Sequence, residues 1–378
     1  MSRIELIATA TFGLEAVVRR EIENLGYKIL KSEDAKITYL ADERGIVRSN
    51  LFLRCADRIL VKMGEFEAKT SEDLFQQTRA LPWEEWIPVD GKFTVVGKSV
   101  KSTLYSVSDC QAIVKKAVVE RLKGVYDVDW FDETGAEYTI QVALLKDIVT
   151  LTIDTSGSSL HKRGYRANAL DAPLKETLAA AMIELSYWNK ERVLMDPFCG
   201  SGTIPIEAAM IARNIAPGLN RHFASEKWDR VPEKLWKEER KKAYAAIDYD
   251  CMPEIYGSDI DPAAIELAKS NAELAGVDDC ITFEVKPVQE LELYGDYGCL
   301  ITNPPYGERL GDMKTVEDMY RSLGGTMHSN ETWSTYVITS MEYFEKLFGK
   351  KASAKRKLFN AWIKTDYYQF YGPRPPKK

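Results

Sequence analysis

The chain has 378 residues and a formal net charge of −6 at pH 7, with 45% hydrophobic and 29% charged residues. This length predicts two or three domains, each able to bury a core, and the composition is that of an ordinary globular protein. No apolar run approaches the roughly 20 residues of a membrane span, and the start shows no signal-peptide pattern, so we expect a cytoplasmic protein. The six cysteines form no C-x-x-C pair and only three histidines are present, so no metal site is expected.

Residues 1–66 predict a small α+β unit. A strand at Ile4–Ala10 is followed by a helix from Leu14 to about Leu25, whose apolar residues recur at the three-and-four spacing of one helical face. A second strand at Lys36–Ala41 and a second helix from about Val47 to Leu53 complete the pattern. No catalytic constellation is present in this segment.

Residues 67–155 predict a second α+β unit. The expected elements are a helix from Ser71, a strand at Lys92–Gly97, a helix at Asp109–Lys123, and two alternating strands at Glu137–Leu144 and Ile148–Asp154. Strands paired across a tight turn, with helices outside them, favour an α+β sandwich. Lys115 and Lys116 lie on the second helix, and either an RNA-facing surface or a solvated helix face would explain them.

The Ser/Gly-rich stretch Thr155–Ser159 is interpreted as the start of a linker. After it the pattern changes. A helix from Pro173 to about Trp188 precedes a strand at Val193–Met195, and from there strands alternate with helices, which is typical of a doubly wound parallel sheet.

The first of these strands runs into a glycine-containing turn, Asp196 to Thr203, and then into a helix. Gly200 and Gly202 permit a tight bend and a close approach of a ligand to the backbone, and the helix N-terminus presents free N–H groups. The spacing matches neither a P-loop nor a dinucleotide fingerprint. Asp196 at the entrance of the loop would repel a phosphate and would suit the ammonium of an amino-acid-like ligand.

The second strand, Glu254–Ser258, ends in Asp259, and a carboxylate at this position is placed to accept hydrogen bonds from ribose hydroxyls. The third strand, Ile281–Val285, leads toward Gln289. The fourth strand, from about Tyr297 to Thr302, leads into Asn303-Pro304-Pro305-Tyr306. Two consecutive prolines end the strand, so the Asn303 amide and the Tyr306 ring are expected on a stiff loop where open α/β sheets bind ligands. Such a loop suits a flat molecule with an exocyclic amino group.

Three motifs together resemble the class I S-adenosylmethionine-dependent methyltransferases that act on an exocyclic or amide nitrogen. They are the loop from Asp196 to Thr203, the strand end at Asp259 and the loop from Asn303 to Tyr306. Five further stretches narrow the resemblance: residues 161–166, 172–177, 214–218, 303–310 and 357–360. They are similar to the THUMP-containing RNA guanine-N2 methyltransferases of the bacterial 23S rRNA type, and the similarity covers nearly the whole chain.

This resemblance implies a ferredoxin-like domain at 1–66, a THUMP RNA-binding domain at 67–155, a linker at 156–170 and a Rossmann-like methyltransferase domain at 171–378. It implies S-adenosylmethionine as cofactor and RNA, rRNA above all, as partner. The implied catalytic residues are Asn303, Pro304, Pro305 and Tyr306. The implied cofactor-binding residues are Pro173, Leu174, Asp196, Pro197, Phe198, Cys199, Gly200, Ser201, Gly202, Thr203, Asp259, Ile260 and Gln289. Candidate RNA-binding residues are Lys115, Lys116, Lys162, Arg163 and Arg166.

In the implied reaction, the Asn303 amide oxygen and the Pro304 carbonyl accept hydrogen bonds from the guanine N2 amine and aim it at the methyl carbon. Tyr306 stacks on the base after it has left its stack. One departure stands out, because Pro287 occupies a position where the family commonly has an Asp that can read the adenine amino group. Adenine recognition is then expected from backbone groups or Gln289. For the insertion at about Asn214–Cys251, a surface helix at Glu233–Ile247 is favoured over a substrate cover.

Three alternatives remain open at this point. A tRNA guanine-N2 methyltransferase would have the same motifs. An N6-adenine methyltransferase acting on nucleic acid would use the same Asn303 loop, although no helix-turn-helix pattern is present. A non-catalytic RNA-binding factor could retain the cofactor pocket for stability, but the intact loops at Asp196 and Asn303 argue against it.

Overall fold

The computed structural model describes residues 3–166, 174–306 and 313–376. The chain forms two compact units that exchange segments. Unit 1 contains the residues up to Ala10, Arg19–Leu160 and His222–Lys241, and unit 2 contains Thr11–Val18, His161–Arg221 and the residues from Lys242 onward. Helix α1 (Glu15–Asn24) is therefore divided between the two units.

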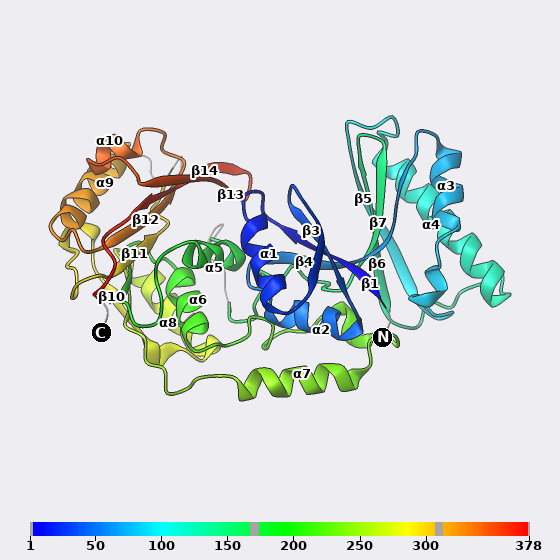
Figure 1. Ribbon diagram of the computed structural model, residues 1–378, viewed down its shortest axis with the longest axis horizontal. Helices are drawn as coiled ribbons and strands as arrows, with labels where there is room; N and C mark the ends of the chain where they lie inside the picture. Colours follow the sequence, from blue (N-terminus) through cyan, green and yellow to red (C-terminus); the bar gives the residue numbers. More distant parts are fainter. Residues whose placement is uncertain (1–2, 167–173, 307–312, 377–378) are drawn as a thin grey trace. The chain divides into compact units, whose positions relative to one another are not determined.

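One mixed sheet runs through the whole of unit 1, in the order β2-β3-β1-β4-β7-β6-β5. Its strands are β1 (Ile4–Ala10), β2 (Lys28–Glu33), β3 (Lys36–Ala41), β4 (Ala56–Glu67), β5 (Lys92–Val100), β6 (Glu137–Leu145) and β7 (Ile148–Asp154). Strand β4 has 12 residues and pairs with β1 through its first part and with β7 from Leu60 onward. The ferredoxin-like and THUMP segments expected from the sequence are thus joined by one strand, which can be followed in Figure 1.

The helices of unit 1 begin where the sequence supplies capping groups. In α2 (Glu43–Phe52), the Asp42 side chain accepts a hydrogen bond from the Gly45 N–H, and in α3 (Ser71–Arg79), Thr70 and Asp73 form a capping box. Ser106 caps α4 (Val107–Tyr126) in the same way. The sequence interpretation placed the start of α2 four residues too late and missed β2, whose residues are mostly exposed and show no apolar alternation.

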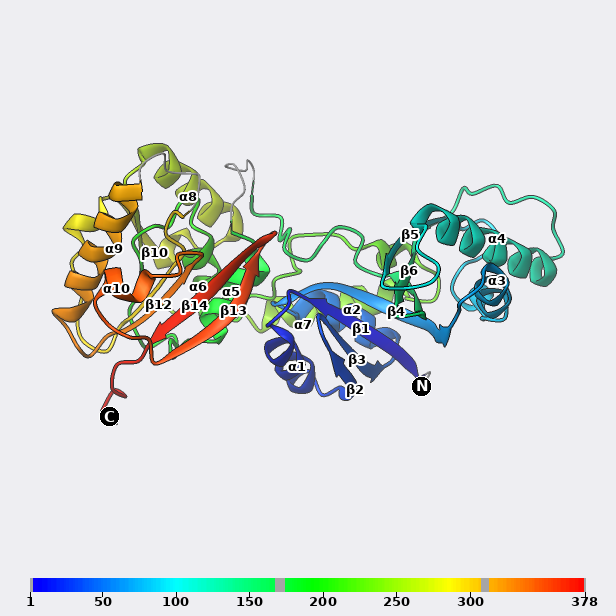
Figure 2. The same cartoon turned by 90° about the horizontal axis from the view of Figure 1, so that it is seen from above.

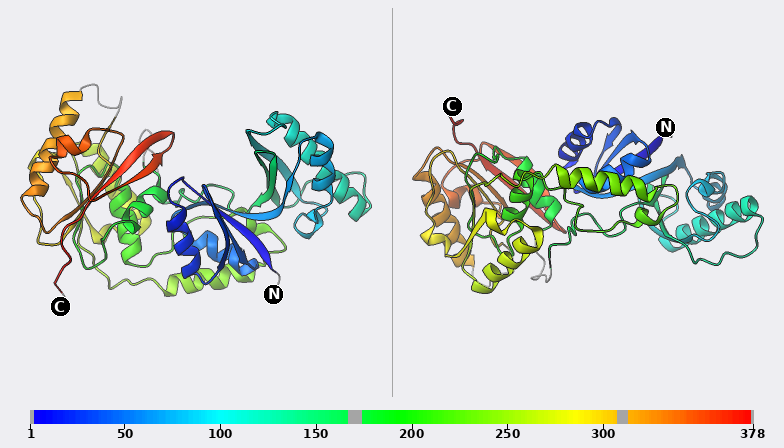
Figure 3. Two further views of the ribbon diagram at one scale, coloured as in Figure 1. Left: turned by 45° about the horizontal axis from the view of Figure 1, so that its top comes forward. Right: turned by 90° about the horizontal axis from the view of Figure 1, so that it is seen from below.

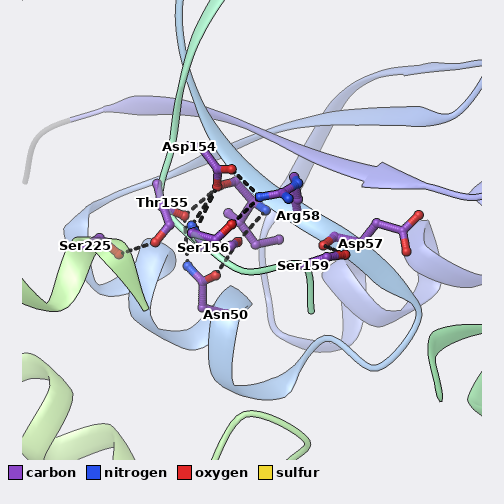
Figure 4. A network of polar contacts seen from close by, with 10 residues as sticks. Asn50, Asp57, Arg58, Asp154, Thr155, Ser156, Ser159 and Ser225 are labelled. Atoms are coloured by element: carbon purple, nitrogen blue, oxygen red, sulfur yellow. Dashed lines mark hydrogen bonds and ion pairs between the residues drawn. The ribbon is translucent and has the colours of Figure 1, made fainter. Parts of the chain in front are cut away.

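The start of the expected linker is part of the core of unit 1. Thr155 and Ser156 are fully buried, and the Asn50 side chain bonds to both of their hydroxyls at 2.9 and 2.6 Å. Arg58 forms an ion pair with Asp154, and Ser225 donates to the Thr155 carbonyl at 2.9 Å (Figure 4). Small hydroxyl side chains that indicate a loop in the sequence here satisfy buried backbone groups, which corrects the linker interpretation for these residues.

Most of the insertion belongs to unit 1: residues His222–Lys241 are part of that unit, although the chain before and after them belongs to unit 2. The helix α7 (Glu233–Ala245) lies where the sequence predicted a surface helix, and its Glu238 and Glu239 pair with Arg44 of α2. Trp228, which precedes α7, stacks on Tyr138 with ring centroids 4.7 Å apart. In the right-hand view of Figure 3, α7 is the green helix beside the blue strands of unit 1. The insertion therefore helps to build the N-terminal unit.

The sheet of unit 2 has the order β10-β9-β8-β11-β12-β14-β13. Its strands are β8 (Leu194–Asp196), β9 (Ile255–Asp259), β10 (Ile281–Val285), β11 (Cys299–Thr302), β12 (Ser334–Thr339), β13 (Ala354–Asn360) and β14 (Ile363–Phe370). All adjacent pairs from β10 to β12 are parallel, whereas β14 is antiparallel to both β12 and β13. The parallel sheet expected from the sequence is thus present from β10 to β12, and the antiparallel β13–β14 hairpin, drawn in orange and red in Figure 2, extends it to a mixed sheet.

Helices cover both faces of this sheet. On one face lie α5 (Glu176–Glu184), α6 (Thr203–Ala212) and α8 (Pro262–Ala275), which contact one another or the strands β8 to β10. On the other face, α9 (Met313–His328) and α10 (Phe344–Phe348) pack with Leu300 and Val337 in one hydrophobic core. This doubly wound arrangement confirms the predicted fold class. Within the described residues, no helix is both long and apolar enough to traverse a lipid bilayer.

Candidate active site

The polar motifs meet at the carboxyl ends of β8, β9 and β11. These strands are parallel, so their ends lie at the same edge of the sheet, where open α/β sheets bind ligands. A cavity of about 330 Å³ opens there. Its lining includes the following predicted residues: Leu174, Asp196, Pro197, Phe198, Cys199, Gly200, Ser201, Thr203, Asp259, Ile260, Gln289, Asn303, Pro304, Pro305 and Tyr306.

Asp196 lies at the end of β8 and is 2% exposed. Its Oδ1 accepts hydrogen bonds from the Thr302 hydroxyl at 2.6 Å and from the Phe198 N–H at 3.2 Å. Burial raises the pKa of the Asp196 carboxyl to about 7, because desolvation disfavours the charged form. A cationic ligand group in the cavity would compensate that cost, so the site favours an ammonium.

The glycine loop has little room for a side chain at Gly202, whereas a Cβ at Gly200 would meet no atom within 4 Å. Gly202 precedes α6 with a φ of +82°, and a Cβ there would lie 3.0 Å from Ala268 and Phe283, so only glycine fits this position. The Gly200 N–H donates to the Asp259 carboxylate at 3.0 Å, so the end of β9 supports the loop after β8. The N-cap residue of α6 is Gly202, which has no side chain to cap the helix, so among the described residues the first N–H groups of α6 can be offered to a ligand.

Asn303 supplies a hydrogen-bond acceptor in the wall of the cavity. Its side-chain oxygen is buried, lines the cavity and has no hydrogen-bond partner among the described residues. Leaving a buried polar atom unsatisfied costs about 1–3 kcal/mol, so such atoms in a cavity wall indicate a missing ligand donor. The hydroxyl of Thr302, the residue before Asn303, donates a hydrogen bond to the Asp196 carboxylate. This bond links the Asn303 loop to the glycine loop that follows β8.

Two elements that follow later in the sequence, α9 and β13, form hydrogen bonds with the Asn303 loop. The Tyr320 hydroxyl of α9 donates to the Pro305 carbonyl at 3.2 Å and contacts the Thr339 hydroxyl at 2.9 Å. The Asn360 amide, at the end of β13, donates to the Tyr306 hydroxyl at 2.7 Å. Tyr306 is only 8% exposed, so its ring forms part of the cavity wall with its hydroxyl already engaged.

The remaining predicted cofactor residues are placed as follows. Gly202 shapes the turn before α6 rather than lining the cavity, and Pro173 lies outside the described residues. Burial raises the pKa of the Cys199 thiol well above its usual value, which disfavours a nucleophilic thiolate and fits a small buried side chain. Pro287, noted in the sequence at the expected adenine position, also lines the cavity, and three further lining residues were missed: Ile204, Val288 and Met319. Met319 comes from α9, and no motif in its segment indicated this location.

The basic residues proposed for RNA contact fall into two groups. Lys115, Lys116 and Lys162 are exposed, and the Lys116 ammonium lies 5.7 Å from the centre of the Phe75 ring. Arg163 is 3% exposed and forms an ion pair with the fully buried Glu207. A buried, paired guanidinium cannot face RNA, so the prediction for Arg163 is corrected to a structural role.

Arg166 also points inward. Its guanidinium donates to the Leu174 carbonyl at 2.8 Å and to the Thr203 hydroxyl at 2.5 Å, and it pairs with Glu176 at 3.1 Å. Leu174 and Thr203 both line the cavity. Arg166 therefore joins two walls of the candidate site, and this placement corrects its assignment to an RNA-facing surface.

Three family models match the chain along its length. Residues 5–60 match a model described as the RlmL ferredoxin-like domain, residues 68–154 match the THUMP domain, and residues 163–369 match the RMKL-like methyltransferase domain. The successive matches agree with the order of domains expected from the sequence.

Two curated relatives are similar over nearly the whole chain. A protein named "Putative RNA methyltransferase YpsC", from Bacillus subtilis, is 50% identical over 100% of this chain and 99% of its own length. "Ribosomal RNA large subunit methyltransferase K/L" from Syntrophotalea carbinolica is 33% identical over 97% of this chain but 53% of its own length. The chain thus spans about half the length of that relative.

Two solved structures share the fold. A structure titled as a predicted N6-adenine-specific DNA methylase from Listeria monocytogenes is 51% identical, covers 99% of this chain and 97% of its own, and has a TM-score of 0.94. SMU.472, titled a putative methyltransferase complexed with SAH (S-adenosylhomocysteine), is 44% identical over 100% of both chains, also with a TM-score of 0.94.

Proposed function

The chain belongs to the RMKL-like methyltransferase family, and from this membership and the geometry of its site we propose that it forms N2-methylguanosine in 23S ribosomal RNA. Its cofactor is S-adenosylmethionine, in keeping with the relative complexed with SAH. This cofactor supplies an electrophilic methyl group. The residues present fit it, because the cavity combines the buried Asp196 carboxyl, the open α6 N-terminus and the Asp259 strand end.

RNA as the substrate class is supported by unit 1 and by the relatives. A THUMP domain at 68–154 is typical of RNA-modifying enzymes, and both curated relatives carry RNA methyltransferase names. Exposed lysines on α4 provide positive charge for phosphate contacts despite the negative net charge.

The observation that carries the proposal is the buried side-chain oxygen of Asn303 in the wall of the cavity, which has no hydrogen-bond partner among the residues that the structure describes. An exocyclic amine needs acceptors for its N–H groups, and the Asn303 amide oxygen with the adjacent Pro304 carbonyl offers two. Accepting these bonds would localise the lone pair of the amine, which is otherwise delocalised into the ring. A planar carboxamide substrate would use the same acceptors, but the flat Tyr306 ring in the same wall favours a base.

The surroundings of Asn303 determine its rigidity. The Thr302 contact to Asp196 and the Tyr320 contact to Pro305 hold the loop from two sides, so little reorganisation is needed when a base enters. Alignment of this kind can lower a barrier by roughly 7–11 kcal/mol in favourable cases. The Asn303 loop would therefore act mainly by positioning the amine.

The geometry of the site supports an exocyclic amine as the methyl acceptor, whereas guanine and ribosomal RNA are supported by the similarity to other proteins. The site would accept adenine N6 or guanine N2 alike, and one solved relative is titled a predicted DNA adenine methylase. The name of the K/L relative favours large-subunit rRNA. Guanine is favoured by the motifs that resemble those of the RNA guanine-N2 methyltransferases.

A transfer assay with nucleoside analysis tests the proposal. Wild-type protein, labelled S-adenosylmethionine and total RNA from a strain lacking the gene should yield labelled N2-methylguanosine in the 23S fraction. For Asn303→Ala, transfer should fall by about 100-fold or more, the loss typical when one preorganised hydrogen-bonding group is removed.

The affinity for SAH, measured by calorimetry, provides the control and should not change in Asn303→Ala, because Asn303 faces the amine. Transfer within a few-fold of wild type would disprove the acceptor role. Labelled N6-methyladenosine, or label in the tRNA fraction, would instead replace guanine or rRNA in the proposal.

A further inference from the structure

Trp362 occupies the tip of the β13–β14 hairpin and is 98% exposed, more than any other large hydrophobic side chain that the structure describes. Aromatic side chains bury 150–250 Å² when packed, so a fully exposed indole gives up a large stabilisation. Ala361 and Trp362 form the tight turn between the two strands, and Ala361 has a φ of +54°. The Trp362 ring therefore projects from the turn, where it can contact a partner.

The topology of unit 2 places this tip at the edge of the sheet that carries the candidate active site. Strand β14 is antiparallel to β12 and to β13, so β13 runs in the same direction as β12. Because β12 is parallel to β11, the end of β13 points to the same edge as Thr302, from which the Asn303 loop leaves.

A direct contact joins the hairpin to the catalytic loop. Asn360, the last residue of β13, donates to the Tyr306 hydroxyl at 2.7 Å, and Trp362 follows two residues later. The exposed ring therefore lies two residues along the chain from a residue that contacts the loop expected to receive the target base.

Charge and shape around the ring fit a nucleic acid. Lys357 and Lys364 lie on the two strands of the hairpin, are exposed and form no ion pair within the part of the chain that the structure describes. Asp366 stands opposite Lys357 in the ladder, and Phe359 stands opposite Lys364. One ring flanked by cations is too small for a stable protein interface, which buries about 800 Å² on each partner, but it matches base stacking with adjacent phosphate contacts.

We propose that Trp362 stacks on a nucleobase of the RNA substrate beside the base that enters the cavity. The inference rests on the proposed RNA methyltransferase function and adds a second aromatic contact outside the pocket. Stacking on a neighbouring base compensates for the contacts that the duplex or loop loses when the target base leaves its stack. Lys357 and Lys364 contact the flanking phosphates.

Substitution of Trp362 tests this inference. In Trp362→Ala, kcat/KM for methyl transfer to total RNA from a strain lacking the gene should fall by about 5- to 100-fold, the range expected for loss of one base–aromatic stack. Trp362→Phe should recover most of the activity because it retains a stacking face, whereas Trp362→Leu should not. Affinity for SAH and the thermal midpoint should match wild type.

Tyr249→Ala is the matched control, since Tyr249 is 65% exposed in the same unit but precedes β9 and so lies toward the opposite edge of the sheet. It should leave kcat/KM within two-fold of wild type. An equal loss in Tyr249→Ala, equal activity of the Leu and Phe variants, or wild-type activity of Trp362→Ala would overturn the inference. So would a change in oligomeric state on size-exclusion chromatography with unchanged transfer, because the ring would then contact a second copy of the chain.

A direct binding measurement separates this inference from the proposed function. Titration with a short single-stranded oligoadenylate should quench the tryptophan fluorescence of wild-type protein, and Trp362→Phe should lose part of that quenching. If wild-type protein methylates no RNA, the proposed function fails, while the presence or absence of Trp362-dependent quenching still decides whether the ring binds bases.

Discussion

At the scale of single residues, the chemistry of the site depends on a few buried polar groups. Asp196 is held by Thr302 and Phe198, and burial raises its pKa to about 7. This carboxyl therefore changes its charge in the physiological range. Protonation removes the negative charge that would attract the ammonium of the cofactor.

The affinity for SAH should depend on pH through Asp196. Above pH 7 the carboxylate is charged and binding is strong, and below pH 7 the dissociation constant should rise by up to about tenfold per pH unit. Calorimetry between pH 5.5 and 8.5, taken as roughly 1.5 units either side of this pKa, measures the effect. Asp196→Asn should bind weakly at every pH, and a wild-type affinity that stays constant across the range would contradict the role assigned to Asp196.

Asn360 illustrates a residue whose role the sequence did not reveal. Residues 357–360 contributed to the family resemblance, but nothing in their pattern indicated what they contact. In the structure, Asn360 bonds to Tyr306, 54 residues away, and holds the hydroxyl of that ring. A hydrogen bond between two such distant segments depends on strand pairing, and residue types alone do not predict it.

At the scale of elements, the insertion between α6 and β9 is unusual because most of it belongs to unit 1, although the elements that flank it belong to unit 2. Ser225, Trp228 and Glu239 all make their described contacts with unit 1, through hydrogen bonds, ring stacking and ion pairs. Trp228 is 2% exposed, packs on Tyr138 and Trp86, and donates from its indole nitrogen to the Glu137 carbonyl. The segment thus serves as a structural part of the N-terminal unit.

Trp228→Ala should destabilise unit 1 by about 3–5 kcal/mol, because it removes a large buried ring and leaves a cavity. Thermal unfolding followed by circular dichroism should show a midpoint lower by several degrees. The affinity for SAH should change little, since the cavity is lined by residues of unit 2. Lys234→Ala, at a side chain that is 83% exposed, is the control and should not alter the midpoint. An unchanged midpoint in Trp228→Ala would show that the ring packing contributes no net stability.

At the scale of the whole molecule, a net charge of −6 requires that RNA binding rest on local positive patches. The candidates for such patches are the exposed lysines Lys115 and Lys116 on α4 and Lys357 and Lys364 on the hairpin. Contacts of this kind release counterions from the phosphates, so their strength falls with salt.

The logarithm of the affinity for RNA should fall linearly with the logarithm of the KCl concentration. The affinity for SAH should change little, because the Asp196 carboxyl proposed to attract its ammonium is buried and therefore weakly screened. In the double variant Lys115→Ala/Lys116→Ala, the salt slope should be smaller by about one unit per lysine. The matched control is Lys234→Ala/Lys237→Ala, where both ammonium groups already pair with glutamates of α7. Filter binding at several salt concentrations provides the measurement, and an identical slope in both double variants would exclude the α4 lysines from the phosphate contacts.

Much of the fold and of the cofactor cavity could be predicted from local signals. Apolar periodicity, glycine turns and the two prolines indicated most of the elements up to β11, and the motifs at Asp196, Asp259 and Asn303 do line one cavity. The elements after Asn303 were not predicted, although α9 supplies Met319 and Tyr320 and β13 supplies Asn360. Their contribution arises from long-range packing, which leaves no periodic signature in a single segment.

The sequence by itself determined the chemistry that gathers at the sheet edge, because parallel strands bring their carboxyl ends together whatever the remaining packing is. Only the tertiary structure decided which charged residues face solvent. Arg163 and Arg166 are indistinguishable from surface cations in a linear pattern, yet the buried carboxylates Glu207 and Glu176 draw them inward. The tertiary structure also assigned Trp228 to unit 1 and Trp362 to solvent, because burial depends on neighbours that are distant in sequence.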